Sequence, residues 1–175
     1  IHEVRLSSFY VDFLSLGVQP VSWARRFQAA LQKELHVAES RLHSTIVKQL
    51  RHIKIPEENP CPPHLVHNDF APGNIIVQDG AIAAIIDWDN AVVDAPQLDF
   101  VKMKYWTTRD SGGELAHDRT LFAAFVNGYG ATGPEIVSSS LFTLYEVLWL
   151  VRVLNFERPK EEQGLPRAPG YPAAE

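Results

Sequence analysis

Two short apolar segments on either side of Asp79 and Gly80 most strongly constrain how this chain can fold. Their sequences are IIV and AIAAIID, and an Asp-Gly pair tolerates the positive φ angles of a type I′ turn. The pattern therefore predicts a two-stranded antiparallel hairpin. Counting from the turn places Asn74 opposite Ile85 and places Asp87 diagonally across from Asn74, about 7–8 Å away at the backbone.

Acidic residues accumulate around this hairpin without basic residues near them in the sequence. Residues 55–101 contain eight acidic residues and no Lys or Arg, whereas the remainder contains 16 basic and 13 acidic residues. Carboxylates that lie together without counter-charges raise each other's pKa. Such a concentration indicates a bound cation, a proton-transfer role, or simply wide spacing on a solvated surface.

Asn74 and Asp87 are both oxygen ligands, and across the expected gap their side chains can share one cation. Oxygen ligands suit a hard ion such as Mg²⁺ that is held partly by substrate phosphates. Asp69 precedes Asn74 by five residues in the same loop, which leaves one carboxylate for proton transfer. Phosphoryl transfer uses this division, with a metal pair on the phosphates and a separate Asp that accepts the proton of the attacking hydroxyl.

The segment HNDFAPGN, residues 67–74, resembles the His-x-Asp-x-x-x-x-Asn motif of aminoglycoside phosphotransferases and their choline, macrolide and fructosamine kinase relatives. The segment IIDWDNAVVDAPQLDF, residues 85–100, is similar to the metal-binding Asp motif that follows it, and the spacing of 13 between Asn74 and Asp87 also matches. The resemblance implies the C-terminal lobe of a protein-kinase-like fold. That lobe is α+β and mostly α-helical, with a small β-hairpin carrying the catalytic loop.

The resemblance also implies a role for each matching residue. Asp69 would be the catalytic base, and Asn74 and Asp87 would bind Mg²⁺. His67 and Asp99 would support the catalytic loop structurally.

The reaction implied by the resemblance is transfer of the γ-phosphoryl group of ATP or GTP to a hydroxyl of a small molecule, an antibiotic or a metabolite, with Mg²⁺ as cofactor. Two positions depart from the family pattern: Asn68 replaces the usual Gly, and Ala71 stands where many relatives have His. Neither is a predicted catalytic group, so both bear on loop geometry. The alternative function is a catalytically silent kinase-like lobe that binds a ligand or a partner.

Four residues of the C-terminal half are candidates for contacting the substrate: Trp106, Tyr145, Glu146 and Trp149. The aromatic ones are expected first as core residues, and the glutamate first as part of a solvated face. An aminoglycoside would need an acidic pocket and a macrolide an apolar one, and the sequence leaves both open.

The helical segments are predicted from apolar residues that recur at steps of three or four. One long pattern runs from Trp23 to Ile53 with a break expected near 36–40, and further helices are expected at 97–106, 114–128 and 135–156. Four prolines in residues 55–64 exclude helix there and predict an extended connection. The segment GYGATG at 128–133 matches a dinucleotide-binding pattern literally, but it lies between two expected helices, which predicts a turn.

The expected organisation is one kinase-like lobe in residues 1–158 followed by a Pro-rich tail in 159–175. No Gly-rich phosphate loop or strand Lys precedes Arg51, so the N-terminal nucleotide lobe is expected to be missing from this chain. A net charge of −5 argues against a nucleic-acid partner, and no apolar run is long enough for a membrane partner. Cys61 is the single cysteine, which favours a reducing, cytoplasmic location.

Overall fold

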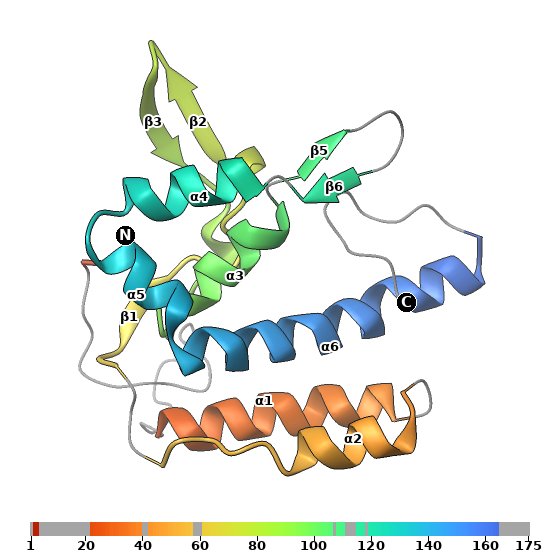
Figure 1. Ribbon diagram of the computed structural model, residues 1–175. Helices are drawn as coiled ribbons and strands as arrows, with labels where there is room; N and C mark the ends of the chain where they lie inside the picture. Colours follow the sequence, from red (N-terminus) through yellow and green to blue (C-terminus); the bar gives the residue numbers. More distant parts are fainter. Residues whose placement is uncertain are drawn as a thin grey trace.

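The computed structural model describes residues 2–3, 22–39, 42–57, 61–106, 108–110, 115–117 and 119–164 (Figure 1). In this part of the chain helices predominate, and the strands form three separate two-stranded antiparallel sheets, β1–β4, β2–β3 and β5–β6. The expected α+β class is confirmed at this level. The helices are α1 (Trp23–Ala38), α2 (Ser44–Arg51), α3 (Gln97–Trp106), α4 (Arg119–Gly128), α5 (Thr132–Ser138) and α6 (Ser140–Glu162), with short 3₁₀ turns η1 (Pro72–Asn74) and η2 (Trp88–Asn90). The strands are β1 (His64–Val66), β2 (Ile75–Gln78), β3 (Ala81–Ile85), β4 (Val92–Asp94), β5 (Thr108–Asp110) and β6 (Leu115–His117).

Helix α1 begins where the sequence predicts. Ser22 is its N-cap, and the Ser22 hydroxyl accepts a hydrogen bond from the Arg25 backbone N–H at 3.3 Å, which satisfies one of the free donors of the first turn. The apolar side chains at steps of three or four form its buried face: Trp23, Phe27, Leu31, Leu35 and Ala38. The expected break is confirmed, because α1 ends at Ala38 and α2 begins at Ser44.

The long helix α6 lies at the centre of the helical part. It packs against α1 on one side and against α3 on the other, and Figure 1 shows it between these two helices. The core is formed mainly by apolar side chains of these three helices. Among the described residues no single helix is long and apolar enough to cross a membrane, and only α5 and α6 joined across a 60° bend meet that test of length and composition.

The hairpin of β2 and β3 projects away from the helices in Figure 1. Both turn residues have positive φ, 52° at Asp79 and 77° at Gly80, as a type I′ turn requires. The predicted hairpin and its turn are therefore confirmed.

Two strand pairings were not expected from the sequence. Strand β1 pairs with β4, which brings the loop after Val66 beside the segment that leads into α3. Strand β6 occupies residues expected as the beginning of a helix at 114–128, so that prediction is wrong at its start, and α4 begins at Arg119. The pairing of β1 with β4 joins residues distant in sequence, whereas β6 pairs with the nearby β5. Strands of three residues are too short for their periodicity to indicate either pairing.

The expected helix at 135–156 is divided and longer. Ser139 is extended, with φ −74° and ψ 148°, and its hydroxyl accepts from the Phe142 backbone N–H at 3.2 Å at the beginning of α6. Helix α6 then continues to Glu162, past the boundary expected at residue 158. Gly164, with φ 68°, follows its end, and this is the left-handed conformation that commonly terminates helices. Residues 165–175 lie outside the described part.

The GYGATG segment is a turn between α4 and α5, as predicted. Gly128 ends α4, Gly130 adopts a φ of 86° between the helices, and Gly133 lies in the first turn of α5. The backbone of α5 passes so close to α4 that a Cβ atom on Gly133 would lie 2.1 Å from the Val126 carbonyl oxygen.

We therefore expect Gly133→Ala to lower the free energy of unfolding by about 1–3 kcal/mol, since backbone atoms must move to admit the methyl group. Gly128→Ala is the matched control, because a Cβ there meets nothing within 4 Å. Urea unfolding of both variants measures the difference. Equal losses in the two variants would contradict the close packing of α4 and α5.

Candidate active site

A buried carboxylate holds the loop that follows β1. Asp99, in the first turn of α3, is 1% exposed, and its oxygens accept hydrogen bonds from the backbone N–H groups of His67 (2.9 Å) and Asn68 (2.8 Å). Asn68 has a φ of 60°, a left-handed conformation that Gly adopts more easily. His2 adds a contact from Nε2 to Asp99 at 3.0 Å, and no spacing pattern in the sequence points to it. Asp99 thus makes the contacts that its predicted supporting role requires.

His67 joins this loop to the end of β3. Its buried ring donates from Nε2 to the Ile86 carbonyl oxygen (2.8 Å), and Nδ1 accepts from the backbone N–H of Asp69 (3.3 Å). The ring also packs against Trp88, with ring centres 4.6 Å apart. Both ring nitrogens are engaged with the backbone, which fits the predicted structural role and leaves neither for proton transfer.

Asp69 and Asn74 are joined across the η1 turn. The side-chain N–H of Asn74 donates to the Asp69 carbonyl oxygen at 2.9 Å. Because this bond uses the amide nitrogen, the amide oxygen is the atom of Asn74 that can bind a cation. The Asp69 side chain is 31% exposed, so its carboxylate can be reached by a bound molecule.

A β-bulge in the hairpin moves Asp87 relative to Asn74. Ile85 pairs with Ile75 instead of Asn74, and the Ile86 N–H donates to the Asn74 carbonyl oxygen at 3.0 Å. The predicted register is therefore wrong by one residue beyond the bulge. The shift brings Asp87 one position nearer to Asn74 along the ladder, since a bulge places two residues of one strand opposite one of the other.

Asp87 stands two residues beyond β3 in the left-handed conformation, with a φ of 64°. Asp and Asn adopt this conformation more readily than other non-glycine residues. Asp87 precedes η2, but its side chain makes no capping hydrogen bond there and is exposed. Its carboxylate is thus available to a ligand.

The donor set fits a hard divalent cation held partly by phosphate. Asn74 offers an amide oxygen and Asp87 a carboxylate, and Mg²⁺ commonly takes few protein ligands and completes its shell with phosphate and water. In the described ranges no three side chains of His, Cys, Asp or Glu lie together as a metal site.

Lys102 places a positive charge next to Asp69. Its Nζ lies 3.7 Å from Asp69 Oδ1 and 4.5 Å from the ring centre of Trp149. Burial lowers the pKa of Lys102, and the Asp69 carboxylate raises it. Arg26 of α1 pairs in the same way with Asp94. The sequence indicated that the carboxylates of residues 55–101 lack counter-charges. The structure differs for Asp69 and Asp94, because basic residues from outside that range fold against these two.

Tyr145 and Trp149, two of the substrate-contact candidates, lie on α6 at different places. Tyr145 is 1% exposed; its hydroxyl accepts from Trp23 Nε1 at 2.6 Å and donates to Asp94. Trp149 is buried and lies against Lys102. Both are core residues as first expected, and Tyr145 also lines a cavity.

Glu146 and Trp106, the other two candidates, are not brought to that cavity. Glu146 is half-buried, pairs with Lys104 and accepts from the Tyr105 hydroxyl at 2.8 Å. Trp106 is half-buried at the end of α3. Glu146 is therefore not the solvated residue expected, and the four candidates do not form one substrate wall.

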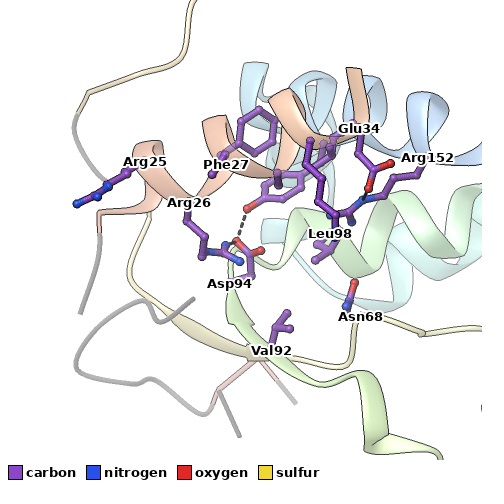
Figure 2. A pocket seen from close by; sticks show the side chains of 14 residues that line it. Arg25, Arg26, Phe27, Glu34, Asn68, Val92, Asp94, Leu98 and Arg152 are labelled. Atoms are coloured by element: carbon purple, nitrogen blue, oxygen red, sulfur yellow. Dashed lines mark hydrogen bonds and ion pairs between the residues drawn. The ribbon is translucent and has the colours of Figure 1, made fainter. Parts of the chain in front are cut away.

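A cavity of about 780 Å³ lies between α1, α6 and the segment from β4 to α3 (Figure 2). Its volume is within the range typical of small-molecule sites. Asn68, which immediately precedes Asp69, contributes to the lining. Figure 2 shows the Arg26–Asp94 pair at one side of the cavity and Glu34 with Arg152 at another.

The chain is similar to a known protein family and to a known kinase. The model of the phosphotransferase enzyme family matches residues 13–137, well over half of the chain. Hygromycin-B 4-O-kinase of Escherichia coli is 29% identical over 72 residues. These residues are 40% of this chain and 21% of that kinase, so the chain matches about a fifth of the length of this relative.

Proposed function

The chain belongs to the phosphotransferase enzyme family, and on this basis we propose that it transfers the γ-phosphoryl group of ATP or GTP to a hydroxyl group of a small molecule. The family resemblance read from the sequence is thereby confirmed. The observation that carries the proposal is the arrangement of Asp69, Asn74 and Asp87 on one loop and hairpin braced by His67 and Asp99.

In the proposed reaction the acceptor hydroxyl oxygen bonds to the γ-phosphorus, and the bond from phosphorus to the bridging oxygen breaks. The hydroxyl proton moves to the Asp69 carboxylate, and the nucleoside diphosphate leaves. Asn74 and Asp87 would hold Mg²⁺, which supplies neutralisation of phosphate charge when bound. Asp99 and His67 keep the loop fixed, so the chain contributes chiefly by positioning.

The exposed apolar side chains of the hairpin support the proposal of a nucleotide lobe outside this chain. Five large apolar residues of residues 76–88 are between 36% and 64% exposed: Ile76, Val77, Ile82, Ile86 and Trp88. A monomer rarely exposes so many large apolar side chains together unless another surface covers them. We propose that the N-terminal nucleotide lobe, with its phosphate-covering loop and strand Lys, packs over this hairpin.

The function is tested by titrating the full-length protein with ATP and with GTP, with and without Mg²⁺. Asp87→Asn is expected to weaken Mg²⁺-nucleotide binding at least about 10-fold, because loss of even an outer-shell partner of a metal site costs that much. Asn tolerates the left-handed conformation at position 87, so the substitution tests the charge and not the backbone.

Asp89→Asn is the matched control, since Asp89 is exposed in η2 and lies two residues away. It should leave nucleotide affinity within about 2-fold of the original protein, since surface substitutions usually change energies by no more than about 0.5 kcal/mol. Nucleotide binding that is independent of both Mg²⁺ and Asp87 would refute the metal assignment. Absence of both nucleotide binding and phosphoryl transfer would instead support the catalytically silent lobe.

A further inference from the structure

The cavity of Figure 2 lies beside the loop that carries the proposed catalytic base. Asn68 lines it and is adjacent to Asp69 in the chain. Leu98 of α3 also lines it, and Lys102, one helical turn further on the same face of α3, is the residue paired with Asp69. A molecule in this cavity can therefore bring a hydroxyl group toward Asp69.

The acidic side chains of the cavity are already engaged with partners from the protein. Asp94 is 3% exposed and pairs with Arg26 while it accepts from the Tyr145 hydroxyl. Glu34 accepts from Arg152 Nε at 3.2 Å and from the Asn155 side chain at 2.9 Å.

Glu146, the further acidic candidate, is paired with Lys104 outside this lining. A cationic ligand would therefore have to displace one of these partners. The displaced group would lose its hydrogen bonds, and leaving a largely buried charge without its partner is costly.

Basic groups, in contrast, remain available. Among the described residues of the lining four are basic and two are acidic, which is an excess of two positive charges. The unmatched ones are Arg25 and Lys33, which are exposed on α1 and form no ion pair with a carboxylate of the described ranges.

The rest of the lining suits a carbon skeleton. Phe27, Leu98 and Leu148 provide apolar wall, and Asn68 provides a polar group near the loop. Small-molecule sites typically combine such apolar walls with a few placed polar groups. The cavity is thus built for a compact ligand that carries both hydroxyl and ionic groups.

We propose that the acceptor of the phosphotransfer reaction is an anionic hydroxyl compound, a sugar acid or hydroxy acid, whose carboxylate is held by the basic residues of α1. This proposal rests on the proposed function, since it needs Asp69 as the base. The anionic group would gain charge-assisted hydrogen bonds from a basic side chain of α1, Lys33 or Arg25, whereas the carboxylates that an ammonium group would meet among the described residues are already paired. An acidic pocket, which an aminoglycoside would need, is not what the described residues form.

Two matched sets of probes test the charge preference by calorimetric titration of the full-length protein. One set is glucuronate, glucose and glucosamine, and the other is gluconate, glucitol and 1-amino-1-deoxyglucitol. The anionic member of at least one set is expected to bind at least about 10-fold more tightly than the cationic member. Preference for the cationic members, equal affinity throughout, or no binding of any probe would overturn the proposal.

Charge reversal on α1 tests the location. Lys33→Glu should remove the preference for the anionic probe, whereas Lys48→Glu, an exposed change on α2 away from the cavity, should keep it. A preference that survives Lys33→Glu together with Arg25→Glu would place the anion elsewhere and overturn the assignment.

Titration with Mg²⁺-ATP in the same preparation separates this proposal from the kinase proposal. Asp87-dependent nucleotide binding together with a preference for cationic probes would reject the acceptor class and keep the kinase. If the unmodified protein shows no Mg²⁺-dependent nucleotide binding, the kinase proposal is rejected, whichever probe of the two sets binds.

Discussion

Asp69→Asn in the full-length enzyme is expected to lower kcat by about 10²–10⁴, the usual contribution of a positioned general base. The amide keeps the shape of the side chain, and the Asn74 and His67 contacts to residue 69 use its backbone, so the loop should persist. The KM for the nucleotide should change little, because Asp69 is not one of the proposed metal ligands. Initial-rate kinetics on the phosphate acceptor measure both constants.

Asp79→Asn is the matched control for this experiment. Asp79 is exposed in the hairpin turn with a φ of 52°, and Asn adopts that conformation as readily as Asp. Its kcat should equal that of the unmodified enzyme. Near-normal turnover in Asp69→Asn would remove Asp69 from the role of base, and an equal loss in Asp79→Asn would attribute the effect to the hairpin as a whole.

Asp94→Ala is expected to lower the free energy of unfolding by about 3–5 kcal/mol, the usual cost of breaking a buried ion pair. Asp94 is 3% exposed and receives Arg26 from α1 and the Tyr145 hydroxyl from α6 at one carboxylate. Asp94 therefore connects α1 and α6 to strand β4. The chain leads from β4 into α3, which carries Asp99. Urea or thermal unfolding monitored by circular dichroism measures the loss.

Asp89→Ala is the control for this second prediction, because Asp89 is exposed and should change stability by no more than about 0.5 kcal/mol. Asp94→Asn should lower the free energy of unfolding less than Asp94→Ala does, since the amide oxygen still accepts a hydrogen bond. If the alanine variant is as stable as the protein with Asp94, the pair of Asp94 and Arg26 makes no net contribution.

Local features of the fold could be predicted from the sequence. The Asp79–Gly80 turn depends on the positive φ that these two residue types allow, and α1 depends on an apolar period with Ser22 at its beginning. Helix α3 has the predicted bounds of 97–106. Each of these depends on interactions between residues close in sequence, which the pattern of residue types contains.

The register of the hairpin could not be predicted from the sequence. Nothing in IIV or AIAAIID indicates the bulge, which brings Ile86 opposite Asn74 and so moves Asp87 toward the other expected metal ligand. The pairing of β1 with β4 was also missed, since a three-residue strand gives no period to detect. The strand at 115–117 was mistaken for helix for the same reason.

The sequence by itself determined the hairpin turn, the beginning of α1, the family and the residue types of the candidate site, because these depend on local conformational preference and on a motif of fixed spacing. Only the tertiary structure decided which charges meet. Lys102 reaches Asp69, Arg26 reaches Asp94, and the acidic residues of the cavity are engaged by partners from other elements. Coulomb energy depends on distance in space and on burial, and the order of residues along a chain fixes neither.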